Sequence, residues 1–134
     1  MKKLNCIMLV DDNRHDNFFH ERVIRKADVT ERVIVHIKAA DALNYLQATP
    51  ANDPGYPDLI LLDINMPGMN GWDFLEEVKS MEKEKQSTIV VMLTTSNNPD
   101  DERKAKDAGV VSDFKSKPLV KAMLDDIIAK FFKD

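Results

Sequence analysis

Short apolar runs recur along the chain, and segments with helical periodicity follow them. Each run is too short for a typical helix and apolar on both faces, which is typical of strands buried in a parallel sheet. The runs are Cys6–Val10, Val33–Ile37, Leu59–Leu62, Ile89–Leu93 and a weaker fifth, Val110–Lys115. This alternation predicts an α/β fold with a central parallel sheet, and right-handed crossovers place helices on both of its faces.

The segments between the runs carry helix signals. Apolar residues recur at intervals of three and four in the clearest of them. These helices are expected over residues 14–27, 38–47, 71–81 and 120–131. A further helix begins at Asn98, which precedes a proline and two aspartates, and ends at Gly109. Thr49–Pro57 is rich in Pro, Gly, Asn and Asp, so it is predicted to be one surface loop.

The size and composition fit one domain. The chain has 134 residues, of which 43% are hydrophobic, so we expect a single domain over residues 1–134 with its own core. The net charge of −4 and the lack of a dense Lys/Arg tract argue against nucleic-acid binding. Cys6 is the only cysteine, and no apolar stretch reaches the length of a membrane span. We therefore expect a cytoplasmic protein that needs no disulfide.

Polar residues follow the ends of most predicted strands. Asp11-Asp12 follows the first run, Asp63 the third, Thr94-Thr95 the fourth, and Lys117 lies near the end of the fifth. Ligands of open parallel sheets bind outside the carboxyl ends of the strands, so these side chains should gather at one edge. Clustered carboxylates either hold a proton or attract a cation. Oxygen ligands without His or Cys favour a hard ion, magnesium or calcium.

This set of residues suits phosphoryl chemistry. A magnesium site uses few protein oxygens, which leaves room for a phosphoryl group. A carboxylate can attack phosphorus, and Asp63 is the best candidate because it follows a four-residue apolar run at the centre of the sheet edge. Lys117 and the metal would neutralise charge, and Thr94 could donate a hydrogen bond to a phosphoryl oxygen. Each acid alone could be a helix cap or a turn residue, so the prediction depends on the combination.

Four segments carry motifs of one known family. They are Ile7–Asn13, Pro57–Gly71, Val91–Thr94 and Lys117-Pro118. The pattern Asp-x-x-Met-Pro-x-Met-x-Gly, which begins at Asp63, is hard to reach by chance. Through these motifs the chain resembles the response-regulator receiver domains of the chemotaxis-regulator type, and the resemblance covers nearly its whole length. The resemblance implies a flavodoxin-like, doubly wound fold with a five-stranded parallel sheet in the order 2-1-3-4-5.

The resemblance implies a role for each residue of the metal site. Asp63 corresponds to the phosphoacceptor. Asp12 corresponds to a direct magnesium ligand, and Asp11 to its neighbour, which usually acts through water. Asn65 would offer its backbone carbonyl to the metal. The implied cofactor is therefore Mg²⁺.

The resemblance also implies a switch. Thr94 corresponds to the hydroxyl residue that moves toward the phosphoryl group, but one extra residue before Lys117 leaves the choice between Thr94 and Thr95 open. Lys117 corresponds to the lysine that pairs with phosphate, and its bond to Pro118 is commonly cis in the family. Phe114 would turn inward on activation and reshape the surface of the fourth helix, fifth strand and fifth helix. The alternative for Phe114 is a plain hydrophobic strand residue.

The implied function is two-component signal transduction. A sensor histidine kinase or a phosphotransfer protein would supply the phosphoryl group, and a downstream protein would read the result, since no output domain is expected. Such a chain is a switch that phosphorylates and dephosphorylates only itself, rather than an enzyme with an external substrate. Because Phe131 and Phe132 could not both face one core, a homodimer through the last helices is a further expectation.

Three alternatives are weighed against this interpretation. A receiver-like interaction module without phosphorylation is distinguished by an incomplete set of acids, Thr and Lys, whereas the set here is complete. A flavodoxin needs a neutral phosphate loop after the first strand, where Asp11-Asp12 would repel the flavin phosphate. An acyl-phosphate phosphatase needs a substrate cap, for which a single short domain leaves little room.

Overall fold

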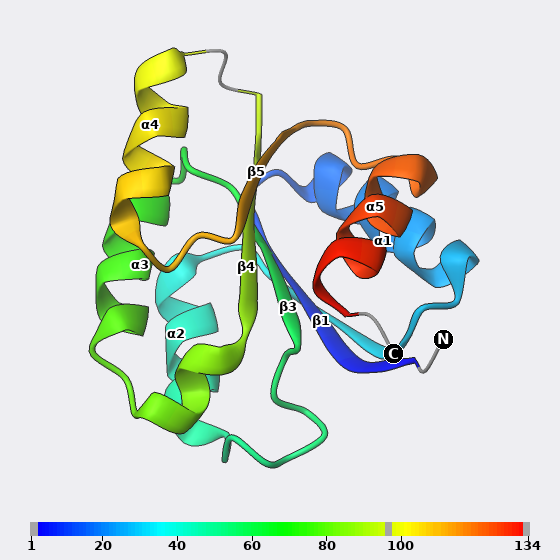
Figure 1. Cartoon of the computed structure of the whole chain (residues 1–134), viewed down its shortest axis with the longest axis horizontal. Coiled ribbons are helices and arrows are strands. Elements are labelled where there is room, and N and C mark those ends of the chain that lie inside the picture. The colour runs from blue at the N-terminus through cyan, green and yellow to red at the C-terminus, as the bar shows by residue number, and fades with distance from the viewer. Residues whose placement is uncertain (1–2, 96–97, 133–134) are drawn as a thin grey trace.

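The sheet has the topology that the sequence implies. The computed structural model describes residues 3–95 and 98–132, and within these residues five parallel strands form one sheet in the order β2-β1-β3-β4-β5 (Figure 1). The strands are β1 (Leu4–Val10), β2 (Thr30–His36), β3 (Leu59–Leu62), β4 (Ile89–Thr94) and β5 (Asp113–Ser116). The predicted fold class and strand order are confirmed.

Helices cover both faces of this sheet. They are α1 (Arg14–Ala27), α2 (Ala39–Ala48), α3 (Gly71–Lys79), α4 (Pro99–Ala108) and α5 (Lys121–Phe131), and a 3₁₀ turn (Lys83–Ser87) precedes β4. Figure 1 shows α1 and α5 on one face and α2, α3 and α4 on the other. The side chains of Asn13 and Asn98 accept backbone hydrogen bonds in the first turns of α1 and α4, and Gly109 ends α4 at φ 78°. Among the described residues, no helix is both long and apolar enough to cross a bilayer.

The inner strands fill two cores, one on each face. In β1, Met8 and Val10 belong to the core beneath α2, α3 and α4, whereas Ile7 and Leu9 belong to the core beneath α1 and α5. The residues of β3 and β4 alternate in the same way. Successive side chains of a strand point to opposite faces, so a strand covered on both sides is apolar throughout. This packing explains the unbroken apolar runs and fixes the strand ends that carry the polar residues.

The fifth strand begins later than predicted. The sequence favours Val110–Lys115, but β5 spans Asp113–Ser116. Val110 and Val111 instead pack, half-buried, against the core beneath α2, α3 and α4 before the strand begins. An apolar pattern indicates that residues are buried, and these two valines are half-buried outside the sheet. The pattern therefore misplaces the strand boundary.

The two aromatic residues at the end of α5 correct another premise. Phe131 ends α5 and Phe132 follows it, yet both are half-buried against the same core beneath α1 and α5. The backbone leaves the helical conformation at Phe132, with φ −128° and ψ 40°, so the second ring is not held on the opposite side of the helix. The premise that the two rings could not face one core is wrong, and the expected homodimer loses that support.

The loop Thr49–Pro57 is anchored to the rest of the fold. Tyr56 is buried within it. The buried Lys85 ammonium lies over the Tyr56 ring and donates hydrogen bonds to the carbonyls of Leu46 and Gln47 at 2.9 and 3.1 Å. A cation at these carbonyls complements the negative end of α2, so this lysine joins the loop to the helix before it.

Candidate functional site

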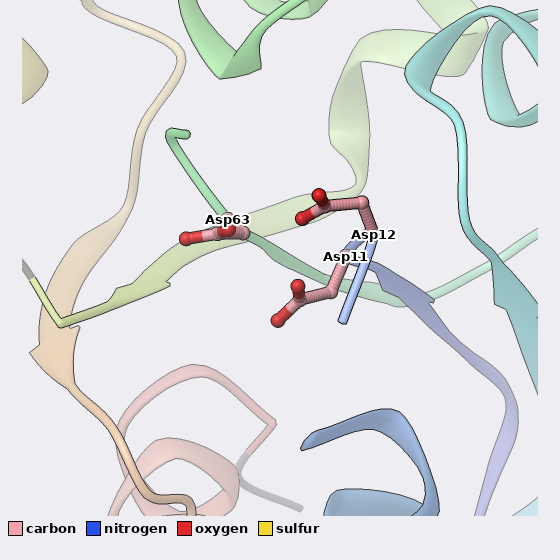
Figure 2. A group of neighbouring side chains, drawn as sticks. All are labelled: Asp11, Asp12 and Asp63. Atoms are coloured by element: carbon pink, nitrogen blue, oxygen red, sulfur yellow. The ribbon is translucent and has the colours of Figure 1, made fainter. Parts of the chain in front are cut away.

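Carboxylates meet at the carboxyl edge of the sheet. Asp11 follows β1 and Asp63 follows β3, and these strands pair directly, with Val10 opposite Leu62. The backbone N–H of Asp63 donates to the Val10 carbonyl at 3.0 Å, which holds the two strand ends side by side. With Asp12 these residues form a cluster in which one oxygen from each carboxylate lies within 4.8 Å of the others. Figure 2 shows the three side chains projecting to the same side of the strand ends.

Lys117 reaches this cluster from the end of β5. Its Nζ lies 2.5 Å from an Asp11 oxygen, 2.8 Å from an Asp16 oxygen and 3.8 Å from an Asp63 oxygen, and only 8% of its side chain is exposed. Burial alone would lower the pKa of Lys117, but hydrogen bonds from its ammonium to Asp11 and Asp16 and the charges of Asp11 and Asp63 outweigh burial and raise it. The lysine is therefore a fixed positive charge. Its peptide bond to Pro118 is cis, as the resemblance implies.

Asp63 holds a proton more tightly than an ordinary carboxyl group. Loss of solvation is the larger cause and the neighbouring Asp11 charge is the next, and together they raise the pKa of Asp63 to about 6. Lys117, Thr94 and the backbone N–H of Ile64 act in the opposite direction without cancelling this shift. An ionised Asp63 is thus unfavourable in the protein alone, and a bound cation would relieve that cost.

The donor set fits a magnesium ion. The cluster offers carboxylate oxygens from Asp11, Asp12 and Asp63, and oxygen-only sites of this kind suit hard cations. Asp11 and Asp63 are buried whereas Asp12 is exposed, so the cluster is open to solvent on the Asp12 side. Asn65 lies exposed in the segment after β3, and the role of its carbonyl as a ligand stays a prediction.

Comparison with known proteins identifies the family. A family model described as the response regulator receiver domain matches residues 7–129. The chain belongs to this family. The two-component response regulator ARR5 of Arabidopsis thaliana is 30% identical over 136 aligned positions, covering 94% of this chain and 72% of ARR5.

Solved structures of receiver domains agree with this family assignment. The crystal structure of a two component response regulator from Cytophaga hutchinsonii has a TM-score of 0.89 and 29% identity, over 99% of this chain and 100% of that one. The bacteriophytochrome response regulator RtBRR has a TM-score of 0.79 and 31% identity, over 100% of this chain and 80% of its own. Receiver domains are phosphoacceptor switches of two-component phosphorelays, and they typically bind Mg²⁺ at an acidic cluster.

Within this receiver domain, the structure separates the two neighbouring threonines. Thr94 is the last residue of β4, is fully buried, and donates a side-chain hydrogen bond to the Asp63 carboxylate. Thr95 is exposed. Phe114 lies on β5, opposite Met92 of β4, and is half-buried against the core beneath α2, α3 and α4. The geometry favours Thr94 as the hydroxyl residue, and the switching role of Phe114 stays a prediction.

Gly71 sets how closely α3 approaches the segment after β3. A Cβ atom on Gly71 would lie 2.7 Å from the Asp63 carbonyl oxygen and 2.9 Å from the Ile64 Cα, both backbone atoms. We expect Gly71→Ala to lower the free energy of unfolding by about 2 kcal/mol, because the helix and the segment after β3 must move apart. Urea unfolding in EDTA measures this change. Gly68→Ala is the control, since its Cβ would meet open space and only its φ of 75° is unfavourable; equal destabilisation by both changes would contradict the close approach.

Two further polar residues, Asp16 and Asn17, lie at the site and were not predicted from the sequence. Asp16 contacts Lys117, and Asn17 is buried and donates from Nδ2 to the Asp11 carbonyl at 2.7 Å. Both lie in the first turns of α1, where a polar residue is usually part of an exposed face or a cap. Asp16 lies four residues after Asp12. This spacing does not show whether Asp16 points toward the site, because that depends on the path of the chain into α1. The sequence alone therefore held no signal for either contact.

Proposed function

We propose that this receiver domain takes up a phosphoryl group on Asp63 from a sensor histidine kinase or a phosphotransfer protein, in a Mg²⁺-dependent reaction. The observation that carries the proposal is the meeting of Asp11, Asp12 and Asp63 within 4.8 Å, with the Lys117 ammonium 3.8 Å from Asp63. Asp11, Asp12, Asp63 and the carbonyl of Asn65 would hold the metal. The residues come from separate strands, so the fold is needed to assemble them.

The chain's own residues account for the chemistry of transfer. A carboxylate oxygen of Asp63 attacks phosphorus, the bond from phosphorus to the donor nitrogen breaks, and the electron pair leaves with that nitrogen. A bound Mg²⁺ supplies positive charge to the phosphoryl oxygens and lowers the repulsion among the acids. Lys117 adds a second positive charge, and the hydroxyl of Thr94 can turn its hydrogen bond from Asp63 to a phosphoryl oxygen.

The output would follow from the movement of Thr94. When its hydroxyl follows the phosphoryl group, the neighbouring strand β5 gains space for Phe114 to turn inward. This rotation would change the surface formed by α4, β5 and α5, which a downstream protein would read. A small change of charge would thereby bias a two-state element. A bacteriophytochrome response regulator is 31% identical to this chain, so a histidine kinase of the bacteriophytochrome type is the first phosphoryl donor to test.

Labelling with acetyl phosphate tests the proposed function without a cognate kinase. We expect the purified protein to acquire one acid-stable, base-labile phosphoryl group when Mg²⁺ is present. Removing the metal with EDTA should slow labelling by about tenfold or more, because the acids then repel the incoming phosphate. Intact-protein mass spectrometry over time measures both rates. Equal labelling with Mg²⁺ and with EDTA would contradict the metal site, and no labelling at all would contradict phosphoryl acceptance from this donor.

A further inference from the structure

The Lys117 ammonium makes a contact that phosphoryl chemistry does not require. Besides the cluster at the strand ends, it lies 2.8 Å from Asp16, a residue of α1 that is 101 positions away in the sequence. The Asp16 side chain is 34% exposed and the Lys117 side chain is 8% exposed, so the pair lies at the rim of the buried site. The contact joins α1 to the segment between β5 and α5.

The hydrogen-bonding capacity of the ammonium decides what this contact can do. A lysine ammonium has three N–H donors, and here three carboxylates surround it: Asp11, Asp16 and, more distantly, Asp63. A cation held at the cluster would draw on the negative charge of Asp11 and Asp63. Asp16 lies outside that cluster, so it would keep its hold on Lys117. A phosphoryl oxygen on Asp63 would take one of the freed donors, but Asp16, 2.8 Å from the ammonium against 3.8 Å for Asp63, would hold the ammonium back from it.

We propose that Asp16 is a positioning residue that holds Lys117 on the α1 side of the site and competes with the phosphoryl group for its ammonium. This inference rests on the proposed function, because it concerns the phosphorylated state of the same site. Asp16 stabilises the unphosphorylated arrangement and so sets how strongly the site retains a phosphoryl group. When Lys117 moves to the phosphoryl group, the link between α1 and the segment before α5 breaks.

The change Asp16→Asn tests this role because it keeps the size of the side chain and removes its charge. The backbone N–H of residue 16 still donates to Asn13, so the cap of α1 is retained. We expect the variant to bind beryllofluoride, a phosphoryl mimic, about fivefold more tightly than the wild type at saturating Mg²⁺, a size typical of a partly exposed ion pair. NMR titration of the backbone amides measures the two dissociation constants.

A second measurement shows whether Asp16 acts through Lys117. Acetic anhydride acetylates free amines, and mass spectrometry gives the rate at Lys117 relative to Lys121, an exposed lysine paired with Asp125. In Mg²⁺ we expect the rate at Lys117 to rise severalfold in Asp16→Asn, because Lys117 loses the 2.8 Å contact that holds its ammonium in the buried site. A purely structural role for Asp16 would leave this ratio unchanged.

Glu21→Gln is the matched control, since Glu21 is another acid of α1 and pairs with Arg25 away from the site. We expect it to leave beryllofluoride binding and the Lys117 rate as in the wild type. An unchanged dissociation constant or an unchanged Lys117 rate in Asp16→Asn would overturn the inference, as would equal effects in Glu21→Gln. A wild-type protein that binds no beryllofluoride would overturn the proposed function instead, and the acetylation rates would still test the ion pair.

Discussion

Asp63→Asn is expected to reduce labelling by acetyl phosphate at least about 100-fold, because an amide cannot serve as the nucleophile in place of a carboxylate. The label should not move to a neighbouring acid. Asp11 is buried, pairs with Lys117, and accepts a hydrogen bond from the Asn13 N–H at 3.0 Å. Asp12 is exposed, so water would surround it where a buried nucleophile is shielded.

Intact-protein mass spectrometry at matched acetyl phosphate and Mg²⁺ concentrations gives the ratio of the two rates. Asp126→Asn is the control, since Asp126 is an exposed acid of α5 far along the chain from the cluster. Its rate should equal that of the wild type. Labelling of Asp63→Asn at the wild-type rate would exclude Asp63 as the acceptor, and the assignment of its neighbours would then have to be revised.

Much of the fold could be predicted because the central strands are covered on both sides. Leu59–Leu62 lies entirely in the two cores, so its four apolar residues and the following acid marked both the strand and the end where it stops. The cap at Asn98 and the left-handed Gly109 marked α4 equally well. These signals are local, and neighbouring residues suffice to interpret them.

The features that the sequence misplaced or left open depend on contacts between distant segments. Val110 and Val111 are apolar because they pack on the core, and only the sheet register shows that β5 starts after them. Thr94 and Thr95 are identical in type, and only the end of β4 decides which one turns toward Asp63.

The same limit holds at the site itself. The ion pair between Asp16 and Lys117 joins residues 101 positions apart, and no residue near either of them in the sequence indicates that they pair. The strand ends could be predicted to converge because parallel strands share an edge. The contacts of Asp16 and Asn17, which enter the site from α1, could not be predicted, because the direction of these side chains depends on how α1 packs on the sheet.

Asp63→Asn is also expected to stabilise the metal-free protein at pH 7.5 by about 3 kcal/mol, a consequence of the raised pKa of about 6. In the unfolded chain the same carboxyl group titrates near its ordinary value of about 4. Between these two values the folded protein binds the proton and the unfolded chain releases it. The contribution of Asp63 to stability is therefore fully present below about pH 4 and is lost as the pH rises through about 6.

Urea unfolding in EDTA at several pH values measures this effect. The advantage of Asp63→Asn over the wild type should be near zero at pH 4, grow between pH 4 and pH 6, and stay constant above. Asp126→Asn corrects for the loss of one negative charge from the protein as a whole, and it should show no comparable gain. If the two variants were equally stable at pH 7.5, the burial of an ionised Asp63 beside Asp11 would be contradicted.

Magnesium should narrow this difference in stability, which would link the instability of the metal-free site to metal binding. The cation binds the ionised carboxylates of the folded protein and has no such cluster in the unfolded chain, so it stabilises the wild type by mass action. Asp63→Asn retains Asp11 and Asp12 but loses one anionic ligand, so its gain should be smaller. A titration in which both proteins gain equally from Mg²⁺ at pH 7.5 would mean that the ion does not contact Asp63. The raised pKa would then be a cost of burial unrelated to metal binding.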